Sequence, residues 1–295
     1  MIAVGYQTLT FPTSKPARFS KPGRFLLEVL QKTLGFSYAP PFSSGACGLG
    51  LNFPFLCSML LFFIRLTKML FIRLQLFRLF SPLTGVLLKL AYLTRLSEWA
   101  NQHKNITYND TRGRWDYNKR YPMYKWVINH ESLSGPINYM EFGVAQARSF
   151  NWFMQENSHP ESRFHGFDTF EGLPEDFGPY KKGAFSNNNS KPVIEDQRGR
   201  FYQGLFQQTL PNFLGSFDGS RRNVVMMDAD LWSSSLYVLS RLQPFLKKGD
   251  IIFFDEFAVP THEFKAYLDF IESTYTSMDL IAAANNYYFV AFKIC

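Results

Sequence analysis

Short, continuously apolar segments that alternate with helix-like segments most constrain the fold of this 295-residue chain. The runs VVMM (224–227) and IIFF (251–254) contain no polar residue, as expected of strands that are covered on both faces. From about residue 137 onward, such runs alternate with segments of helical periodicity. This alternation predicts an α/β fold with a doubly wound, mostly parallel sheet.

The expected elements can be placed along the chain from their apolar periodicity and their flanking turn residues. We expect strands over residues 138–144, 163–168, 223–228, 250–255 and 287–293, with a short edge strand over 200–203. We expect helices near residues 123–131, 148–156, 234–246 and 262–274. These elements define a predicted domain over residues 106–295, preceded by a long N-terminal region.

The positive charge of the chain lies almost entirely in that N-terminal region. The formal net charge is +7, and residues 1–97 contain eleven Lys and Arg against a single acid, Glu28. The remaining residues hold twenty basic and twenty-three acidic side chains. Because a nucleic-acid-binding domain needs its positive charge on the folded recognition surface, we do not expect nucleic acid as a partner.

The N-terminal region itself has two parts of different composition. Residues 1–50 are rich in Gly, Pro, Ser and Phe, which is typical of a disordered leader, of translated sequence upstream of the native start, or of an organelle transit peptide. Residues 51–105 form an apolar, basic extension whose longest uncharged run, 51–64, is shorter than the ~20 residues of a spanning helix. In one continuous helix, the four basic residues between 65 and 78 would not gather on one face. Residues 51–96 are therefore expected either to contact a membrane surface or to pack on the core or on a partner subunit.

Acidic residues mark the ends of the central predicted strands, where doubly wound folds bind their ligands. The first loop carries Gly143, which lets backbone approach a ligand closely, and Asp168 ends the next strand, where an acid suits ribose hydroxyls. The loop matches the G-x-G-x-x-G pattern poorly, because Ala145 and Ala147 replace glycines. This favours a nucleoside ligand without a pyrophosphate, such as S-adenosylmethionine, over NAD, and a plain strand-to-helix turn is the structural alternative.

Four further acids, Asp228, Asp230, Asp255 and Glu256, would meet if the strands that precede them are neighbours. Converging carboxylates need a cation or hydrogen-bond donors to offset their repulsion, and oxygen ligands suit Mg²⁺, Mn²⁺ or Ca²⁺ better than zinc. Such an ion could ease the deprotonation of a substrate hydroxyl. The structural alternative is that an acid such as Asp230 caps the following helix.

Five segments, in chain order, resemble one known family. They read EFGVAQARSF (141–150), GFDTFEGLPEDF (166–177), YQGLFQQTLPNF (202–213), MMDADLWSSSLYVLSRLQPFLKKGDIIFFDEF (226–257) and HEFKAYLDF (262–270). They are similar to the macrocin O-methyltransferase-like (TylF/MycF-type) family of class I S-adenosylmethionine-dependent enzymes, which methylate sugar hydroxyls in natural products. The resemblance implies a seven-stranded sheet, a metal-assisted O-methyltransferase with a sugar or glycan-type acceptor, and Mg²⁺ (or Mn²⁺) as a second cofactor.

The resemblance also implies roles for individual residues. Those at the methionine end of S-adenosylmethionine would be Glu141, Gly143 and Ser149; those at its ribose would be Asp168, Thr169 and Phe170; and the metal ligands would be Asp228, Asp255 and Glu256, with Asp230 as a fourth. The family usually has glycine where this chain has Ala147. If that position needs a positive φ, alanine costs about 1 kcal/mol and weakens cofactor binding.

The general base has more than one candidate. His262 follows the predicted strand 250–255 by a short loop and could accept a proton from the substrate, although a histidine at a helix start is also explained by solvent contact. Asp228 or Asp230 could act as the base instead. The long polar segment 171–197 is expected to be either a lid or a surface insertion.

Two alternatives to an active methyltransferase remain at this stage: a non-catalytic scaffold that keeps the fold, and an NAD-dependent oxidoreductase. We expect a cytoplasmic protein that acts on a small-molecule or glycan acceptor. Homo-oligomer formation and peripheral membrane contact through residues 51–96 are further expectations.

Overall fold

The computed structural model describes the backbone of residues 53–295 and the side chains from residue 59 onward. The chain divides into two compact units, residues 1–69 and residues 70–295. In the first unit the structure describes residues 53–69, which form most of helix α2 (Phe53–Arg73). The leader expected over residues 1–50 lies outside the described residues.

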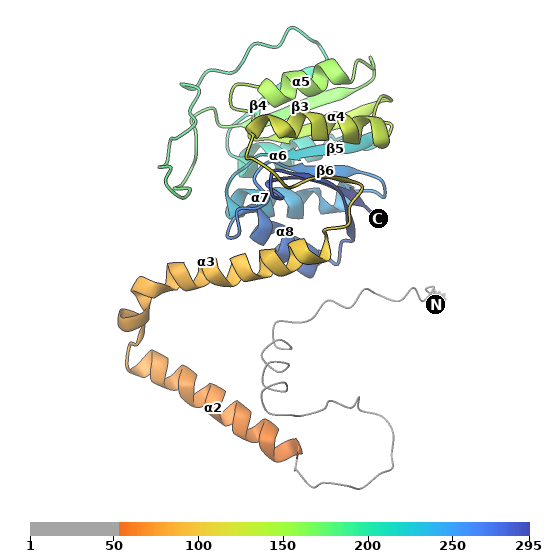
Figure 1. The fold of residues 1–295 in the computed structure, drawn as a ribbon. Coiled ribbons are helices and arrows are strands. Elements are labelled where there is room, and N and C mark those ends of the chain that lie inside the picture. Colours follow the sequence, from red (N-terminus) through yellow and green to blue (C-terminus); the bar gives the residue numbers. More distant parts are fainter. Residues whose placement is uncertain (1–52) are drawn as a thin grey trace, which may run out of the picture. The chain divides into compact units, whose positions relative to one another are not determined.

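The second unit is built around a sheet, which has eight strands among the described residues (Figure 1). In chain order they are β1 (Tyr108–Asp110), β2 (Ile137–Phe142), β3 (Arg163–Asp168), β4 (Gly199–Gln203), β5 (Arg222–Met227), β6 (Ile251–Phe254), β7 (Met278–Ala284) and β8 (Phe289–Ile294). They lie in the order β1-β7-β8-β6-β5-β2-β3-β4. Only β8 runs antiparallel to its neighbours in this sheet, so the predicted doubly wound, mostly parallel sheet is confirmed.

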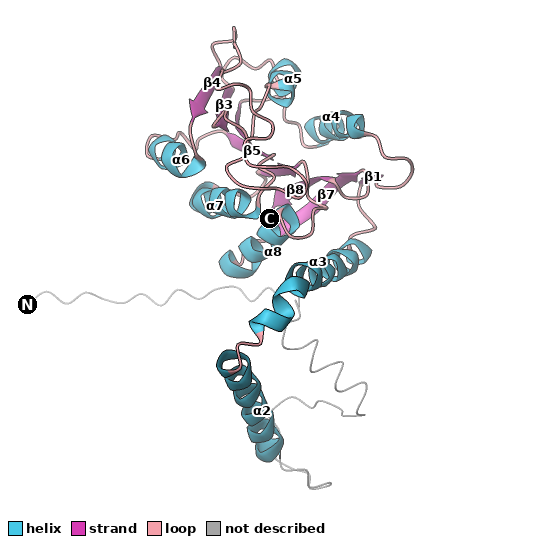
Figure 2. Cartoon of the chain, turned by 90° about the vertical axis from the view of Figure 1, so that its left-hand side faces the viewer, coloured by secondary structure: helices cyan, strands magenta, loops and turns pink. Residues whose placement is uncertain are grey.

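Helices cover both faces of the sheet, as Figure 2 shows. They are α3 (Phe77–Gln102), α4 (Arg120–His130), α5 (Arg148–Glu156), α6 (Phe206–Leu214), α7 (Trp232–Leu242) and α8 (Glu263–Thr274). Helices α4 and α5 pack on one face, while α6, α7, α8 and the C-terminal end of α3 pack on the other. Because both faces are covered, the central strands are buried throughout: every residue of β2 and of β6 is buried.

Three elements were not expected from the sequence. Strand β7 reads MDLIAAA, whose alanines favour a helix, but pairing with β1 and β8 makes it a strand. Helix α6 contains Pro211, which argues against a helix, but Leu210 and Phe213 bury its apolar side in the core. Strand β1 is only three residues long and adds an eighth strand at the sheet edge, where the family resemblance implied seven.

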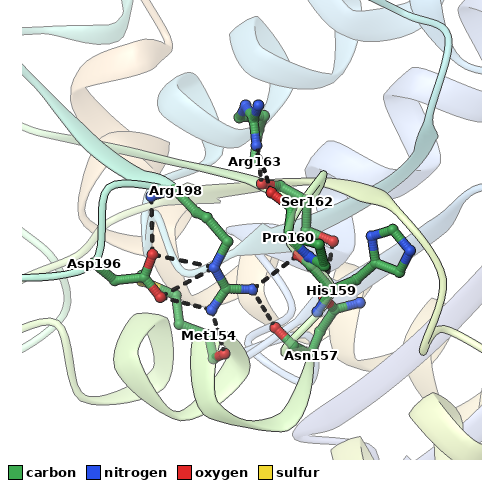
Figure 3. Close-up of polar contacts among 8 residues, drawn as sticks. All are labelled: Met154, Asn157, His159, Pro160, Ser162, Arg163, Asp196 and Arg198. Atoms are coloured by element: carbon green, nitrogen blue, oxygen red, sulfur yellow. Dashed lines mark hydrogen bonds and ion pairs between the residues drawn. The ribbon is translucent and has the colours of Figure 1, made fainter.

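A half-buried arginine fixes the point where the long segment 171–197 returns to the sheet (Figure 3). The Arg198 guanidinium donates to the carbonyl oxygens of Met154 (3.0 Å) and Asn157 (2.6 Å) at the end of α5. It also pairs with the Asp196 carboxylate at 2.6 Å. A cation at the C-terminus of a helix satisfies its last carbonyl groups and complements its dipole. This contact holds the start of β4 against α5, at the sheet edge where β3 and β4 begin.

Helix α3 belongs only partly to the core. Its C-terminal turns bury Leu96 and Trp99, and the Trp99 ring packs between Phe257 and the ring of His103. The preceding turns expose their apolar side chains. Between α2 and α3 the helix is interrupted at Gln75, which has a φ of 51°. Within residues 53–295, no helix has the length and apolar character needed to cross a membrane.

Candidate active site

A cavity of about 450 Å³ lies at the carboxyl ends of β2, β3 and β5. Strand β2 lies between β3 and β5, so the chain leaves β2 toward one edge of the sheet and later returns to build the other. This is the topological switch point, where doubly wound folds bind ligands. The cavity has the size of an ordinary small-molecule site.

Gly143 allows the ends of β2 and β5 to approach each other. Its φ is +93°, and a Cβ at this position would lie 1.8 Å from the backbone oxygen of Asp228. The N–H of Asp228 in turn donates to the carbonyl of Phe142 at 2.9 Å. Any other residue at position 143 would therefore push apart two strands that form the floor of the cavity.

Asp168, the last residue of β3, lines the cavity and holds the loop that follows β2. Its Oδ2 accepts hydrogen bonds from the N–H groups of Val144 (2.7 Å) and Ala145 (2.8 Å), and its Oδ1 accepts one from Phe170 (2.7 Å). A carboxylate offers about four lone-pair positions. Capacity for at least one ligand hydroxyl therefore remains, at the position where an acid was expected from the sequence.

The other predicted cofactor residues divide into two groups. Thr169 lines the cavity together with Gly143 and Asp168. Glu141, Ser149 and Phe170 are buried beside it and do not line it. The Phe170 ring packs against Phe201 with 5.7 Å between ring centroids.

Glu141 is a buried acid with its own partners. It accepts hydrogen bonds from the Tyr139 hydroxyl and from Ser149 Oγ (2.8 Å). Burial raises its pKa to about 8, although the two donors oppose that shift. We therefore assign Glu141 and Ser149 to the support of the loop after β2, and their predicted contact with the methionine end of a cofactor stays a prediction.

Three of the four predicted metal ligands, Asp228, Asp230 and Glu256, do line the cavity. Burial and the neighbouring acids raise the pKa of Asp228 well above its ordinary value. Burial and the adjacent Glu256 carboxylate raise the pKa of Asp230 to about 8, and burial raises that of Glu256. Asp230 therefore keeps its proton near neutral pH unless a cation enters the cavity.

Asp255, the fourth, points away from the cavity into an internal cluster and is 1% exposed. Its Oδ2 pairs with the Arg120 guanidinium at 3.0 Å and accepts from the Tyr117 hydroxyl at 3.1 Å. Its Oδ1 accepts from the Tyr124 hydroxyl at 2.6 Å. Both carboxylate oxygens thus already have donors from this chain.

These contacts decide how well the predicted metal site fits. Among the described residues, no group of three or more His, Cys, Asp or Glu side chains is arranged to hold a metal ion. Asp255 does not fit such a site because Arg120 supplies its positive partner. Three of the four acids after β5 and β6 meet in the cavity as expected, whereas Asp255 is paired with Arg120. Their role as metal ligands stays a prediction.

His262, the other candidate base, lies outside the cavity lining. It precedes α8, and its ring packs edge-on against Phe177 with 4.8 Å between centroids. Burial lowers its pKa, so the ring is neutral near pH 7. Its location favours a structural role over proton transfer, whereas Asp228 and Asp230, the other candidates, line the cavity.

Ala147 has a positive φ, the condition under which alanine was expected to be less favourable than glycine. Its φ is 59°, in the left-handed region, and Ala145 in the same loop has a φ of 45°. Alanine in this region costs about 1 kcal/mol relative to glycine. The Ala147 side chain is fully buried beside α5, so its methyl packing offsets part of that cost.

The segment 171–197 forms one wall of the cavity. Gly172, Leu173, Glu175 and Phe185 line it, and the Ser233 hydroxyl of α7 donates to Glu175 at 2.7 Å. Two backbone hydrogen bonds, Leu173 to Ala184 and Gly183 to Leu173, close the segment on itself. These contacts support the lid interpretation over that of a remote surface insertion.

Sequence reasoning missed the residues that neutralise Asp255. Arg120 and Tyr124 lie on α4 and Tyr117 just before it, more than 130 residues away from Asp255 in the chain. Glu263, which accepts the N–H of Glu256 at 3.0 Å, was also missed. No local motif connects α4 with Asp255, so only the packing of α4 on the sheet identifies Arg120, Tyr117 and Tyr124.

Comparison with known proteins supports the resemblance found in the sequence. Residues 183–288 match the family model described as macrocin-O-methyltransferase (TylF). No curated protein sequence matches the chain. The matched residues run from the cavity wall through β5 and β6 to the start of β8 and include the acids that follow both strands.

Solved structures similar to this chain include several methyltransferases. They are the calicheamicin methyltransferase CalS11 (21% identity, 60% of this chain and 78% of that chain, TM-score 0.46), the O-methyltransferase NovP (18%, 60% and 78%, 0.46) and the SAH-bound Podospora anserina methyltransferase PaMTH1 (14%, 69% and 88%, 0.41). On the family match, this chain is an S-adenosylmethionine-dependent methyltransferase that resembles the macrocin O-methyltransferase (TylF) family.

Proposed function

We propose that the chain methylates a hydroxyl of a sugar or glycan-type acceptor, with S-adenosylmethionine as methyl donor. The charge of the cavity carries this proposal. Five carboxyl side chains line it, those of Asp168, Glu175, Asp228, Asp230 and Glu256, and the described lining residues include no Lys, Arg or His. Such a lining favours the sulfonium cation of S-adenosylmethionine over the pyrophosphate of NAD, because opposite charges attract and like charges repel.

The residues present fit this cofactor. Asp168 keeps acceptor capacity for a ribose hydroxyl, and Thr169 and Gly143 line the cavity beside it. S-adenosylmethionine supplies an electrophilic methyl group when bound. The segment 171–197 covers one side of the cavity and would exclude water from the transfer.

The carboxyl groups at the ends of β5 and β6 supply the base. An acceptor hydroxyl must lose its proton as its oxygen forms the new bond to carbon, and a carboxylate within hydrogen-bond reach can take that proton. Asp228 and Asp230 line the cavity and fit this role. We assign no step to a metal ion, because Asp255 is already held by Arg120, Tyr117 and Tyr124.

Two further expectations complete the proposal. We place the catalytic domain at residues 106–295, with Leu96 and Trp99 of α3 completing its core. We also place the protein in the cytoplasm and expect it to form a homo-oligomer.

A methyl-transfer assay tests the reaction. The full chain would be incubated with methyl-labelled S-adenosylmethionine and neutral glycosides, and the labelled product analysed. We expect transfer to a hydroxyl oxygen, with at least a hundredfold lower rate for Asp228→Asn or Asp230→Asn, since general base catalysis contributes about 10²–10⁴-fold. The exposed Asp279→Asn is the matched control. Unchanged rates in both cavity variants would exclude the proposed bases.

Calorimetry in buffers of different ionisation enthalpy tests the charge argument separately. A sulfonium cation entering the cavity stabilises the ionised carboxylates, so S-adenosylmethionine binding at pH 7 should release protons from Asp228, Asp230 or Glu256. S-adenosylhomocysteine lacks the positive sulfur and should release fewer. Equal proton release with both ligands would remove the electrostatic support for this assignment.

A further inference from the structure

The N-terminal turns of α3 carry an apolar stripe that is exposed to solvent. Leu79, Leu83, Val86, Leu87, Leu90 and Leu93 recur at helical spacing, and each is between 52% and 70% exposed. Phe80 lies on the same side and is 40% exposed. Seven large apolar side chains on one side of a single helix exceed the scattered exposure that is normal for a soluble surface.

The stripe points away from the domain. At about 100° per residue, Tyr92, Leu96 and Trp99 lie on nearly the opposite side of α3 and pack on the core. Arg78, Ser81, Thr84 and Lys89 lie with them on that opposite side. The side opposite the stripe also carries Phe77 and Leu88, which are 61% and 47% exposed, so the first turns of α3 are only partly amphipathic.

The charges of this region have one sign. No Asp or Glu occurs between residues 53 and 97, whereas six Lys or Arg do. In the described structure, Arg95 pairs with Glu272 of α8, while no ion pair is formed by Arg78 or Lys89. An apolar stripe on a helix whose other side carries uncompensated cations fits a partner that is both apolar and anionic.

We propose that α3 binds the surface of a bilayer containing anionic phospholipid, with the stripe among the acyl chains and Arg78 and Lys89 at the headgroups. Helices with Leu and Phe on one face and Lys or Arg on the other lie in the membrane interface. The stripe from Leu79 to Leu93 is roughly 21 Å long at 1.5 Å per residue, which is suited to lying on a bilayer. A second copy of the chain fits less well, because pairing two stripes would bring cations together without an acid between residues 53 and 97.

Vesicle flotation of the full chain tests this proposal independently of methyl transfer. The wild type should float with vesicles of phosphatidylcholine and phosphatidylserine, and much less with phosphatidylcholine alone. Leu83→Gln/Leu90→Gln should lower the partition coefficient about a hundredfold, because each leucine loses its transfer to an apolar environment. Arg78→Gln/Lys89→Gln should lower it about thirtyfold on the anionic vesicles only. Ser81→Gln/Thr84→Gln, on the opposite side of the same helix, is the matched control and should float like the wild type.

Thermal unfolding and sedimentation velocity without vesicles complete the test. All three pairs are exposed, so their unfolding midpoints should match that of the wild type. Equal flotation of the Leu83/Leu90 pair and the control pair would overturn the proposal. A second result would also overturn it: a wild type that is dimeric and does not bind vesicles, together with a monomeric Leu83→Gln/Leu90→Gln variant. The stripe on α3 would then be an interface between two copies of the chain.

Discussion

Replacing Arg120 by methionine tests the conclusion that this chain neutralises Asp255 internally. The Arg120 and Asp255 side chains are 9% and 1% exposed, and their closest atoms are 3.0 Å apart. Methionine keeps much of the arginine volume and removes the charge. Breaking a buried ion pair by removing one partner costs about 3–5 kcal/mol, because the remaining charge is left uncompensated. For a unit of this size, that cost corresponds to a fall of roughly 6–20 °C in the unfolding midpoint. Denaturant unfolding of the variant and of the wild type, compared at one pH, measures this cost.

Two controls make the test specific. Arg95→Gln removes an ion pair with Glu272 whose side chains are 39% and 50% exposed, and this change should cost at most about 1 kcal/mol. In the double variant Arg120→Met/Asp255→Asn, most of the loss should be recovered, because no buried charge remains. The reasoning is refuted if Arg120→Met costs no more than Arg95→Gln, or if the cost is the same in the Asp255→Asn background.

Two further variants test the floor of the cavity. Burial raises the pKa of Glu141 to about 8, so between about pH 4.5 and pH 8 the folded protein holds a proton that the unfolded chain releases. The contribution of Glu141 to the free energy of unfolding therefore falls as the pH rises through this range. Glu141→Gln should therefore flatten the decline of the unfolding midpoint over that range, and parallel curves for variant and wild type would contradict this pKa. Denaturant unfolding should show that Gly143→Ala destabilises the protein by several kcal/mol more than Gly178→Ala. Both glycines have a positive φ, which costs about 1–2 kcal/mol for alanine. Of the two, only Gly143 lies where a new Cβ would meet backbone atoms. Equal losses would show that the β2 and β5 ends can separate freely.

Much of the fold could be predicted from the sequence, because the pattern that identifies the strands is local. The runs 224–227 and 251–254 are apolar since helices cover both faces of the sheet, and β3 and α5 have the predicted bounds. Strand β7 could not be predicted, because its alanine-rich sequence becomes a strand only through pairing with its neighbours.

The site could be predicted only as far as strand ends determine it. Asp168, Asp228 and Asp230 follow strands directly, so a sheet with the right order brings them to one cavity. The side-chain direction of Asp255 depends on Arg120 and Tyr124, which approach it from α4. A helix separated from its partner by more than 130 residues leaves no local signal for that contact, so the metal-site prediction included an acid that is already paired.

Titration calorimetry of the full chain with S-adenosylmethionine, for the wild type and Asp168→Ala, tests the central claim most directly. The account predicts micromolar binding by the wild type, and at least tenfold weaker binding by Asp168→Ala, since hydrogen bonds to a charged group contribute about 1.5–3 kcal/mol. The exposed Asp279→Ala is the control, and thermal unfolding of each variant verifies that it is folded. No binding by folded wild type, or equal binding by Asp168→Ala, would contradict the account.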